Sequence, residues 1–256
     1  MKHLFTLTLM ALFGLQSWAQ AQNQDSLALE KLRAQSGVDP TRIQTRVGYS
    51  FLFNDAAGNS GSVKNRLTVN LGVGRWSFQV RNEVVSVLPQ SETATFTSSF
   101  GDPRFSVLNA FFVKGRHALA AAGELNMPIA KAGFGTQYLS ITPSLTYAYT
   151  ISPTLIFATQ PQYTFALARA AFLPDLHVIT VRTFLAKFTR AGYFFVFEPR
   201  PVFDLENDKV DFILSPIIGR SIGAGFNLVF LSEISVKEET RSSQGVVYLF
   251  GFNKNF

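Results

Sequence analysis

Apolar side chains recur at every second position in segment after segment of this chain. Between Leu139 and Tyr149, large apolar residues alternate one by one with serine, threonine and alanine. A period of two is that of a β-strand whose two faces differ. We predict strands of this kind over residues 41–53, 62–73, 75–89, 102–113, 116–129, 137–150, 154–168, 175–188, 191–205, 210–220, 224–237 and 244–256. The chain is therefore expected to be all-β.

The connections between these strands alternate in length. After even-numbered strands they are tight turns, such as Gly74-Arg75 and Lys114-Gly115. After odd-numbered strands they are mostly longer, as at 90–101 and 130–136. Short periplasmic turns that alternate with longer outer loops are typical of transmembrane barrels of the outer membrane. The pattern predicts a transmembrane antiparallel β-barrel of about 12 strands over 41–256, with both termini in the periplasm.

The N-terminus predicts export. Lys2 precedes a short apolar stretch over 4–15, and Ala19-Gln20-Ala21 has the small-x-small form of a cleavage site. Residues 1–21 are therefore expected to be a signal peptide, since a spanning helix needs about 20 apolar residues. The sequence contains no cysteine, which excludes disulfides, thiolate metal sites and lipidation on cysteine.

Composition agrees with a barrel in the outer membrane of a Gram-negative bacterium. Hydrophobic residues make up 47% and charged residues 16%, whereas a soluble domain has about 25% charged residues. The charge-free run 132–168 contains Pro143, Pro153 and Pro161, so it does not suit a membrane helix. Only helices and closed barrels satisfy the backbone within a bilayer. The formal charge of +6 comes from dispersed basic residues, which argues against a nucleic-acid partner.

Residues 22–40 precede the predicted barrel. They contain a short possible helix that would place Leu29 and Leu32 on one face, before Gly37 and Pro40 end it. The expectation is a disordered periplasmic leader. The alternative is a small segment inside the barrel mouth.

The last strand, 244–256, ends on an aromatic residue with no polar tail. It resembles the closing strand of Gram-negative outer-membrane barrels, which the barrel-assembly machinery reads, although Lys254 stands where such signals often carry an aromatic residue. The residues of this predicted assembly signal are Tyr248, Phe250, Phe252 and Phe256.

Four motifs in the middle of the chain carry a second resemblance. They are Gly101-Asp102-Pro103-Arg104, the run 122–128, Pro143-Ser144-Leu145 and Gln160-Pro161-Gln162-Tyr163. Over about 100–165 they resemble outer-membrane transporters of the MetA-pathway phenol-degradation type, but Pro128-Ile129-Ala130 replaces the Pro-Thr-Gly usual there. The resemblance implies a barrel that moves small solutes, apolar or aromatic ones among them.

The strand pattern assigns charged residues to the lumen, because an arginine or lysine facing lipid at the midplane costs about 2–4 kcal/mol. Near mid-strand these are Arg81, Glu83, Glu124, Arg182, Glu198 and Arg200. Nearer the strand ends they are Arg42, Arg46, Lys64, Arg66, Asp211 and Glu233. One hypothesis is a constriction that selects solutes. The other is a paired network that fills and closes the barrel.

The stretch Glu198-Pro199-Arg200-Pro201 stands out, since two prolines in one strand remove hydrogen-bond donors from the ladder. It predicts either a local opening in the barrel wall or a simple edge irregularity.

No catalytic constellation is expected. Beyond the predicted signal peptide the histidines are His117 and His177, and the strand 154–168 beside His177 offers no serine. We expect no enzyme activity, no cofactor and no metal. The predicted function is passive transport of small solutes, with a non-conducting structural barrel as the alternative. The expected partners are outer-membrane lipids and lipopolysaccharide, the barrel-assembly machinery and a small-molecule solute.

Overall fold

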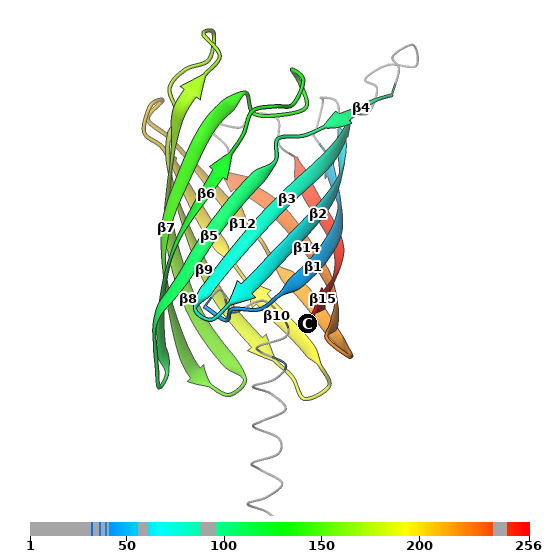
Figure 1. Ribbon diagram of the computed structural model, residues 1–256, viewed down its shortest axis with the longest axis vertical. Coiled ribbons are helices and arrows are strands. Elements are labelled where there is room, and N and C mark those ends of the chain that lie inside the picture. Colours follow the sequence, from blue (N-terminus) through cyan, green and yellow to red (C-terminus); the bar gives the residue numbers. More distant parts are fainter. Residues whose placement is uncertain are drawn as a thin grey trace, which may run out of the picture.

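The alternating segments form the strands of one closed antiparallel β-barrel in the computed structural model (Figure 1). The structure describes residues 32, 36, 39, 41–55, 61–87, 96–237 and 245–256. The predicted signal peptide 1–21 and most of the predicted leader 22–40 lie outside the described residues.

Twelve spans make up the barrel wall, as the sequence predicts. The strands are β1 (Arg46–Asp55), β2 (Ser62–Val73), β3 (Trp76–Val87), β4 (Thr97–Phe100), β5 (Arg104–Lys114), β6 (His117–Asn126), β7 (Tyr138–Ser152), β8 (Leu155–Arg169), β9 (His177–Phe188), β10 (Tyr193–Phe197), β11 (Pro199–Asp204), β12 (Lys209–Leu214), β13 (Ile217–Gly223), β14 (Phe226–Lys237) and β15 (Val246–Asn255). Three spans are built from two strands each, β4 with β5, β10 with β11 and β12 with β13, because short irregular breaks interrupt them.

The barrel closes between its first and last strands. β1 pairs antiparallel with both β2 and β15, and Tyr49 lies opposite Phe252 across the closing seam. Beyond the ladder, the Phe256 amide donates to the Thr45 carbonyl at 3.0 Å. Closure leaves the sheet without a free edge, which is the condition for strands to cross a bilayer.

The first strand is shorter than the predicted 41–53. Thr41 forms a turn instead of entering the ladder, because its amide and hydroxyl both donate to Asp39 Oδ1, at 3.0 and 2.6 Å. The chain then passes close to Gly72 of β2, where an added Cβ would lie 2.8 Å from the carbonyl carbon of Gln44. Only a residue without a side chain fits this approach. β1 therefore begins at Arg46.

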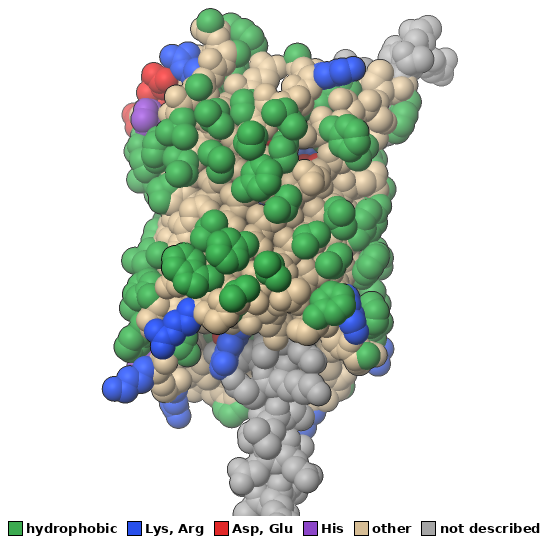
Figure 2. All heavy atoms as spheres, in the orientation of Figure 1, with side chains coloured by type: hydrophobic (Ala, Val, Ile, Leu, Met, Phe, Trp, Pro, Cys, Tyr) green, Lys and Arg blue, Asp and Glu red, His purple; other side chains and the backbone are tan. Residues whose placement is uncertain are grey.

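The two faces of the wall differ as the period of two predicts. On β15, Tyr248, Phe250 and Phe252 point outward, whereas Gly251 between them is buried. Figure 2 shows large apolar side chains over the outer wall, with charged side chains gathered at its two rims. An apolar band between more polar rims is the exterior of a barrel that contacts lipid.

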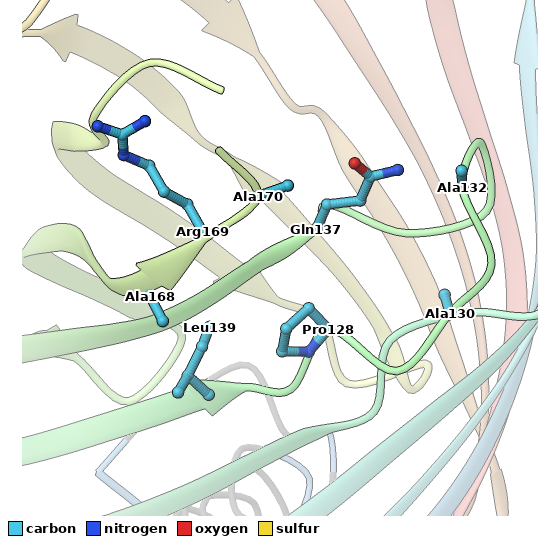
Figure 3. A pocket seen from close by; sticks show the side chains of 8 residues that line it. All are labelled: Pro128, Ala130, Ala132, Gln137, Leu139, Ala168, Arg169 and Ala170. Carbon is cyan, nitrogen blue, oxygen red and sulfur yellow. The ribbon is translucent and has the colours of Figure 1, made fainter. Parts of the chain in front are cut away.

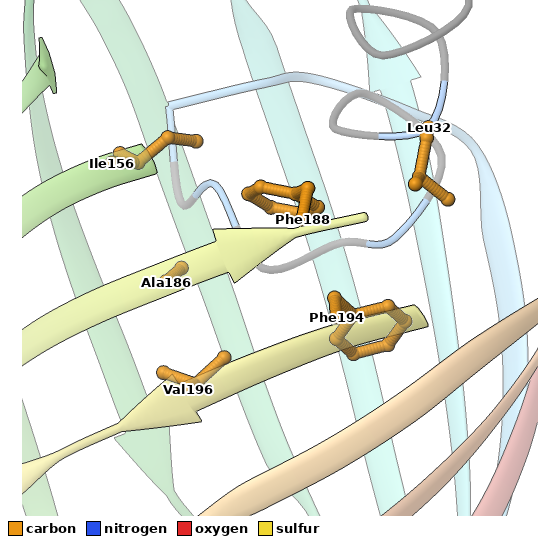
Figure 4. Close-up of a cluster of buried hydrophobic side chains, with 6 residues drawn as sticks. All are labelled: Leu32, Ile156, Ala186, Phe188, Phe194 and Val196. Atoms are coloured by element: carbon orange, nitrogen blue, oxygen red, sulfur yellow. The ribbon is translucent and has the colours of Figure 1, made fainter. Parts of the chain in front are cut away.

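A buried apolar cluster lies inside the barrel at the end where β9 and β10 meet (Figure 4). Leu32, which is helical, packs there against the wall. Its partners are Ile156, Ala186, Phe188, Phe194 and Val196. This contact lies in the mouth of the barrel that holds the tight turns. Among the described residues, no helix is both long and apolar enough to span a membrane.

The proline-rich stretch interrupts the wall on one side only. β11 stays paired with β12, and the Ser215 amide donates to the Glu198 carbonyl at 2.9 Å. On the other side, β9 pairs with β10 up to Phe197 and with β11 from Val202, which leaves 198–201 outside the ladder. Because successive residues of a strand face opposite neighbours, Pro199 and Pro201 present their missing donors to β9.

Candidate functional site

The charged residues assigned to the lumen lie on the inner face of the wall. On β3, Val80 and Val84 point outward and are 38% and 37% exposed, and Arg81 and Glu83 alternate with them. The inner charged residues form two groups. We call Arg66, Arg81, Glu83, Arg104 and Glu124 the β3 cluster, and Arg182, Glu198, Arg200 and Glu233 the β11 cluster.

In the β3 cluster, ion pairs run from strand to strand along the wall. Arg66 Nε contacts Glu83 Oε1 at 2.6 Å, because the two residues are opposite one another in the β2–β3 register. Glu124 of β6 receives Arg81 at 2.8 Å and Arg104 at 3.2 Å. Three arginines thus face two glutamates, so this cluster carries one net positive charge.

In the β11 cluster, one carboxylate is the centre. Glu198 is fully buried and accepts two hydrogen bonds from Arg182, at 2.7 and 3.1 Å. Arg200 contacts the same carboxylate at 2.8 Å and reaches Glu233 of β14, also at 2.8 Å. A buried charge is tolerated only where partners of this kind replace its water. Two arginines and two glutamates leave the cluster neutral.

The two clusters occupy opposite walls of the barrel. The β3 cluster lies on β2, β3, β5 and β6, and the β11 cluster lies on β9, on β14 and at the start of β11. β7 and β8 separate them on one side, and β15 and β1 on the other. In the part of the chain that the structure describes, every ion pair of these residues stays within its own cluster. The ion pairs therefore run along each wall and not across the lumen.

One of the two walls between the clusters, formed by β7 and β8, carries polar side chains at mid-depth on its inner face. The polar residues on this face are Ser140, Thr142, Ser144, Thr146, Gln160, Gln162 and Thr164, while the buried Ala148, Ile156 and Ala158 lie on the same face nearer the turn that joins the two strands. Thr142 and Thr164 share a hydrogen bond at 2.9 Å, and the Gln162 amide donates to Gln160 at 3.2 Å. Short side chains leave room beside the wall, and their hydroxyl and amide groups offer hydrogen bonds to a passing solute.

The remaining predicted lumen residues lie toward the strand ends. Arg42 precedes β1 and lies 3.8 Å from Asp39, while Arg46 donates to Asn255 at 2.7 Å, both near the periplasmic mouth. Lys64 is on the inner face of β2, toward its outer end, and Asp211 is buried on β12.

Arg104 and Asp102 have roles that the sequence analysis did not assign. Arg104 and Ser106 both bind Glu124, and their alternation with Phe105 and Val107 is the signal that places them inward. Asp102 is buried, and its carboxylate holds the loop that connects β6 and β7.

The two histidines bind tyrosines. His117 Nδ1 shares a hydrogen bond with the Tyr147 hydroxyl at 2.9 Å, and His177 Nδ1 shares one with Tyr163 at 2.7 Å. Each pair also brings its rings together, as aromatic residues do at a membrane interface. Within the described ranges, no group of three metal-ligating side chains occurs.

No protein-family model matches the chain, and no curated protein matches its sequence. Solved structures do match. The NanC porin has a TM-score of 0.62 and 10% identity, over 82% of this chain and 98% of that one. The KdgM porin has a TM-score of 0.58 and 10% identity, over 82% and 99%. An outer-membrane channel from Pseudomonas putida F1 has a TM-score of 0.63 and 9% identity, over 84% and 96%.

These similarities show the fold, which is that of an outer-membrane β-barrel. None of these three structures is named as a member of the phenol-degradation group, so that resemblance stays a prediction.

Proposed function

We propose that this protein is an outer-membrane channel through which small solutes move passively. The observation that carries the proposal is the arrangement of charge. The ion pairs of each cluster lie along its own wall, with one net positive charge in the β3 cluster and none in the β11 cluster, and β7 and β8 between them carry polar inward side chains. A lumen of this kind keeps opposed charged surfaces beside a path for solute, which is how pores orient and select what passes.

The solutes that we propose are small molecules, apolar or aromatic ones among them, as the resemblance over about 100–165 implies. Any of them has to pass polar and charged side chains at mid-depth, because both clusters lie there. A hydrogen-bonding group on the solute would match the serine, threonine and glutamine side chains of β7 and β8.

A non-conducting structural barrel is the second candidate, and one contact favours it. Leu32 is buried against the inner wall near the periplasmic mouth, where it narrows the path. The ion pairs do not add to such a closure, because none of those described links the two clusters.

Ion selectivity of the refolded protein in a planar bilayer tests the proposal. Glu124→Ala leaves Arg81 and Arg104 without their carboxylate, so preference should shift toward anions. Arg200→Ala removes a positive charge beside Glu198 and Glu233, so preference should shift toward cations. Lys187→Gln is the control, because Lys187 points outward at the periplasmic end of β9.

Opposite shifts of the reversal potential in a salt gradient would support a charged constriction. Unchanged currents in both lumen variants would show that the ion path avoids the clusters. Absence of single-channel events, together with absence of solute-driven swelling of liposomes, would overturn the channel function and leave the structural barrel.

A further inference from the structure

A pocket of about 430 Å³ lies at the outer rim of the barrel, between the β6–β7 loop and the end of β8 (Figure 3). Its lining is mainly small and apolar, with two polar side chains. The lining residues are Pro128, Ala130, Ala132, Gln137, Leu139, Ala168, Arg169 and Ala170. Pockets for small molecules have about 300–1,000 Å³ and combine apolar walls with a few placed polar groups.

One wall of the pocket is held by a buried carboxylate. Asp102 accepts hydrogen bonds from the Ala130 amide at 3.0 Å and from the Thr136 amide and hydroxyl at 2.6 and 3.0 Å. Thr136 also accepts from the Asn126 amide at 2.9 Å. A Cβ at Gly135 would lie 2.5 Å from both Asp102 oxygens, so the loop closes this tightly only with glycine there. The loop therefore has a fixed shape before any ligand arrives.

The opposite wall is held by an ion pair. Arg169 Nε contacts Asp175 Oδ1 at 2.8 Å, and the guanidinium also donates to the Leu173 carbonyl. The Tyr138 hydroxyl donates to the Pro174 carbonyl at 3.0 Å, which ties β7 to the same loop. A guanidinium has five N–H groups, so Arg169 keeps donors beyond these two contacts.

Gln137 lies between the two walls with a backbone φ of 60°, in the left-handed region that glutamine seldom adopts. Its side-chain amide has no hydrogen-bond partner among the described residues. Strain of this kind is retained where surrounding contacts over-determine the backbone, and it often accompanies binding sites. Here the strained residue places an amide beside the apolar lining (Figure 3).

We propose that this pocket binds a small, mainly apolar molecule that carries one neutral hydrogen-bond acceptor, before the molecule enters the lumen. The apolar lining takes the body of the ligand, and Arg169 or Gln137 donates to its acceptor. Asp175 offsets the charge of Arg169, so a neutral acceptor such as a ketone fits better than a second carboxylate. The role in capture rests on the proposed channel function, whereas the binding itself does not.

Fluorine NMR on the refolded protein can test the binding, since the chain has no cysteine of its own. A trifluoromethyl tag on Lys131→Cys reports on the exposed loop beside the pocket. The same tag on Ala191→Cys, in a periplasmic turn, corrects for partition of the probe into detergent. Acetophenone is the probe, and toluene is the matched molecule without an acceptor.

We expect acetophenone to shift the Lys131→Cys signal saturably and the Ala191→Cys signal not at all, with toluene binding more weakly. Ala168→Phe and, from the other wall, Ala130→Phe should each raise the dissociation constant at least tenfold. The control is Ala191→Phe in the Lys131→Cys protein, where the tag is on residue 131 and the periplasmic turn is untagged. This change should leave the dissociation constant unchanged. Folding of each variant is checked by its heat-dependent migration on gels.

A saturable shift that persists in both Ala168→Phe and Ala130→Phe would overturn the assignment of binding to this pocket. Equal affinity for toluene and acetophenone would overturn the proposed role of the hydrogen-bond acceptor. Conductance of the same samples separates the two proposals. Binding that Ala168→Phe abolishes in a protein without conductance would leave the site standing and remove the channel. Normal conductance in a protein that does not bind acetophenone at the pocket would support the channel and overturn the binding site.

Discussion

Glu198 makes the strongest electrostatic demand of any residue in the lumen. Its side chain is fully buried and holds both Arg182 and Arg200. Without Glu198, Arg200 keeps Glu233 and Arg182 loses its carboxylate. Because the Arg182 side chain is 32% exposed, water offsets part of the cost of breaking a fully buried ion pair, which is about 3–5 kcal/mol. We therefore expect Glu198→Ala to lower the free energy of unfolding by about 1–3 kcal/mol, less than the full cost of breaking a buried pair, measured by urea unfolding of the refolded barrel.

The matched control is Glu206→Ala in the exposed turn after β11, where surface substitutions change stability by about 0.5 kcal/mol or less. Equal midpoints for the two variants would mean that water stabilises Arg182 and Arg200 as effectively as the Glu198 carboxylate does.

The inner position of such residues could be predicted, but their partners could not. Alternation alone places Arg81, Glu83 and Glu198 on one face of their strands. Partner choice depends on register and on reach across a strand. Arg200 contacts Glu233 on β14 although β12 lies between β11 and β14, and no spacing in the sequence indicates that contact.

At the scale of elements, most strands lie where periodicity places them, and the differences have local causes. The predicted strand 62–73 coincides with β2, whereas the first strand begins later because Asp39 fixes Thr41 in a turn. The break between β10 and β11 lies at the proline stretch 198–201, for which the sequence predicts either a local opening or an edge irregularity, although the inward and outward alternation itself continues through Glu198. A period of two indicates which way the side chains point. It does not indicate whether the backbone hydrogen bonds to the neighbouring strand are formed.

The proline stretch gives a test of that missing ladder. Pro199 and Pro201 face β9, where 198–201 have no backbone pairing. The double change Pro199→Val and Pro201→Val supplies two donors, and each new hydrogen bond contributes about 0.5–1.5 kcal/mol. We expect a higher unfolding temperature of the refolded barrel. Pro174→Val in the outer loop is the control. If the melting temperature falls instead, the unpaired stretch is fixed by packing and not by the prolines.

The position of the segment before β1 is also not determined by the strand pattern. Leu32 packs against Phe188 and Phe194 in the mouth at the periplasmic end (Figure 4). An aspartate there would place a charge among apolar side chains, which is unfavourable without a partner. Leu32→Asp should therefore release the contact and raise single-channel conductance, while Ile129→Asp, exposed at the outer end, should not. Identical conductance of Leu32→Asp and wild type would show that Leu32 lies outside the ion path and does not narrow it.

At the scale of the whole molecule, backbone pairing all around the wall holds the chain together, and the described apolar clusters inside are small. Lipid replaces the core as the apolar environment for outward side chains such as Phe230 and Phe250, which lie opposite one another on β14 and β15. The alternation of turn and loop lengths predicts this architecture because outer-membrane barrels have short turns at the periplasmic end and longer loops at the outer end. Loop pockets depend on contacts between distant residues, so the sequence pattern does not predict them, whereas Pro199 and Pro201 indicate the break in the wall.

Experiment can separate two roles of the closing strand. One is its pairing in the barrel wall, and the other is its proposed recognition by the barrel-assembly machinery. Phe256 lies beyond the ladder, 77% exposed, so its ring adds little to the stability of the closed barrel. Phe256→Ala should therefore leave refolding in detergent unchanged and lower the amount of folded barrel in cell membranes several-fold. Phe230→Ala removes an equally outward ring from the wall and should not lower that amount. The measurement is the amount of folded protein in membrane fractions, determined by heat-dependent migration on gels. Equal levels for both variants would assign recognition to Tyr248, Phe250 and Phe252, while a refolding defect in Phe256→Ala would make its role structural.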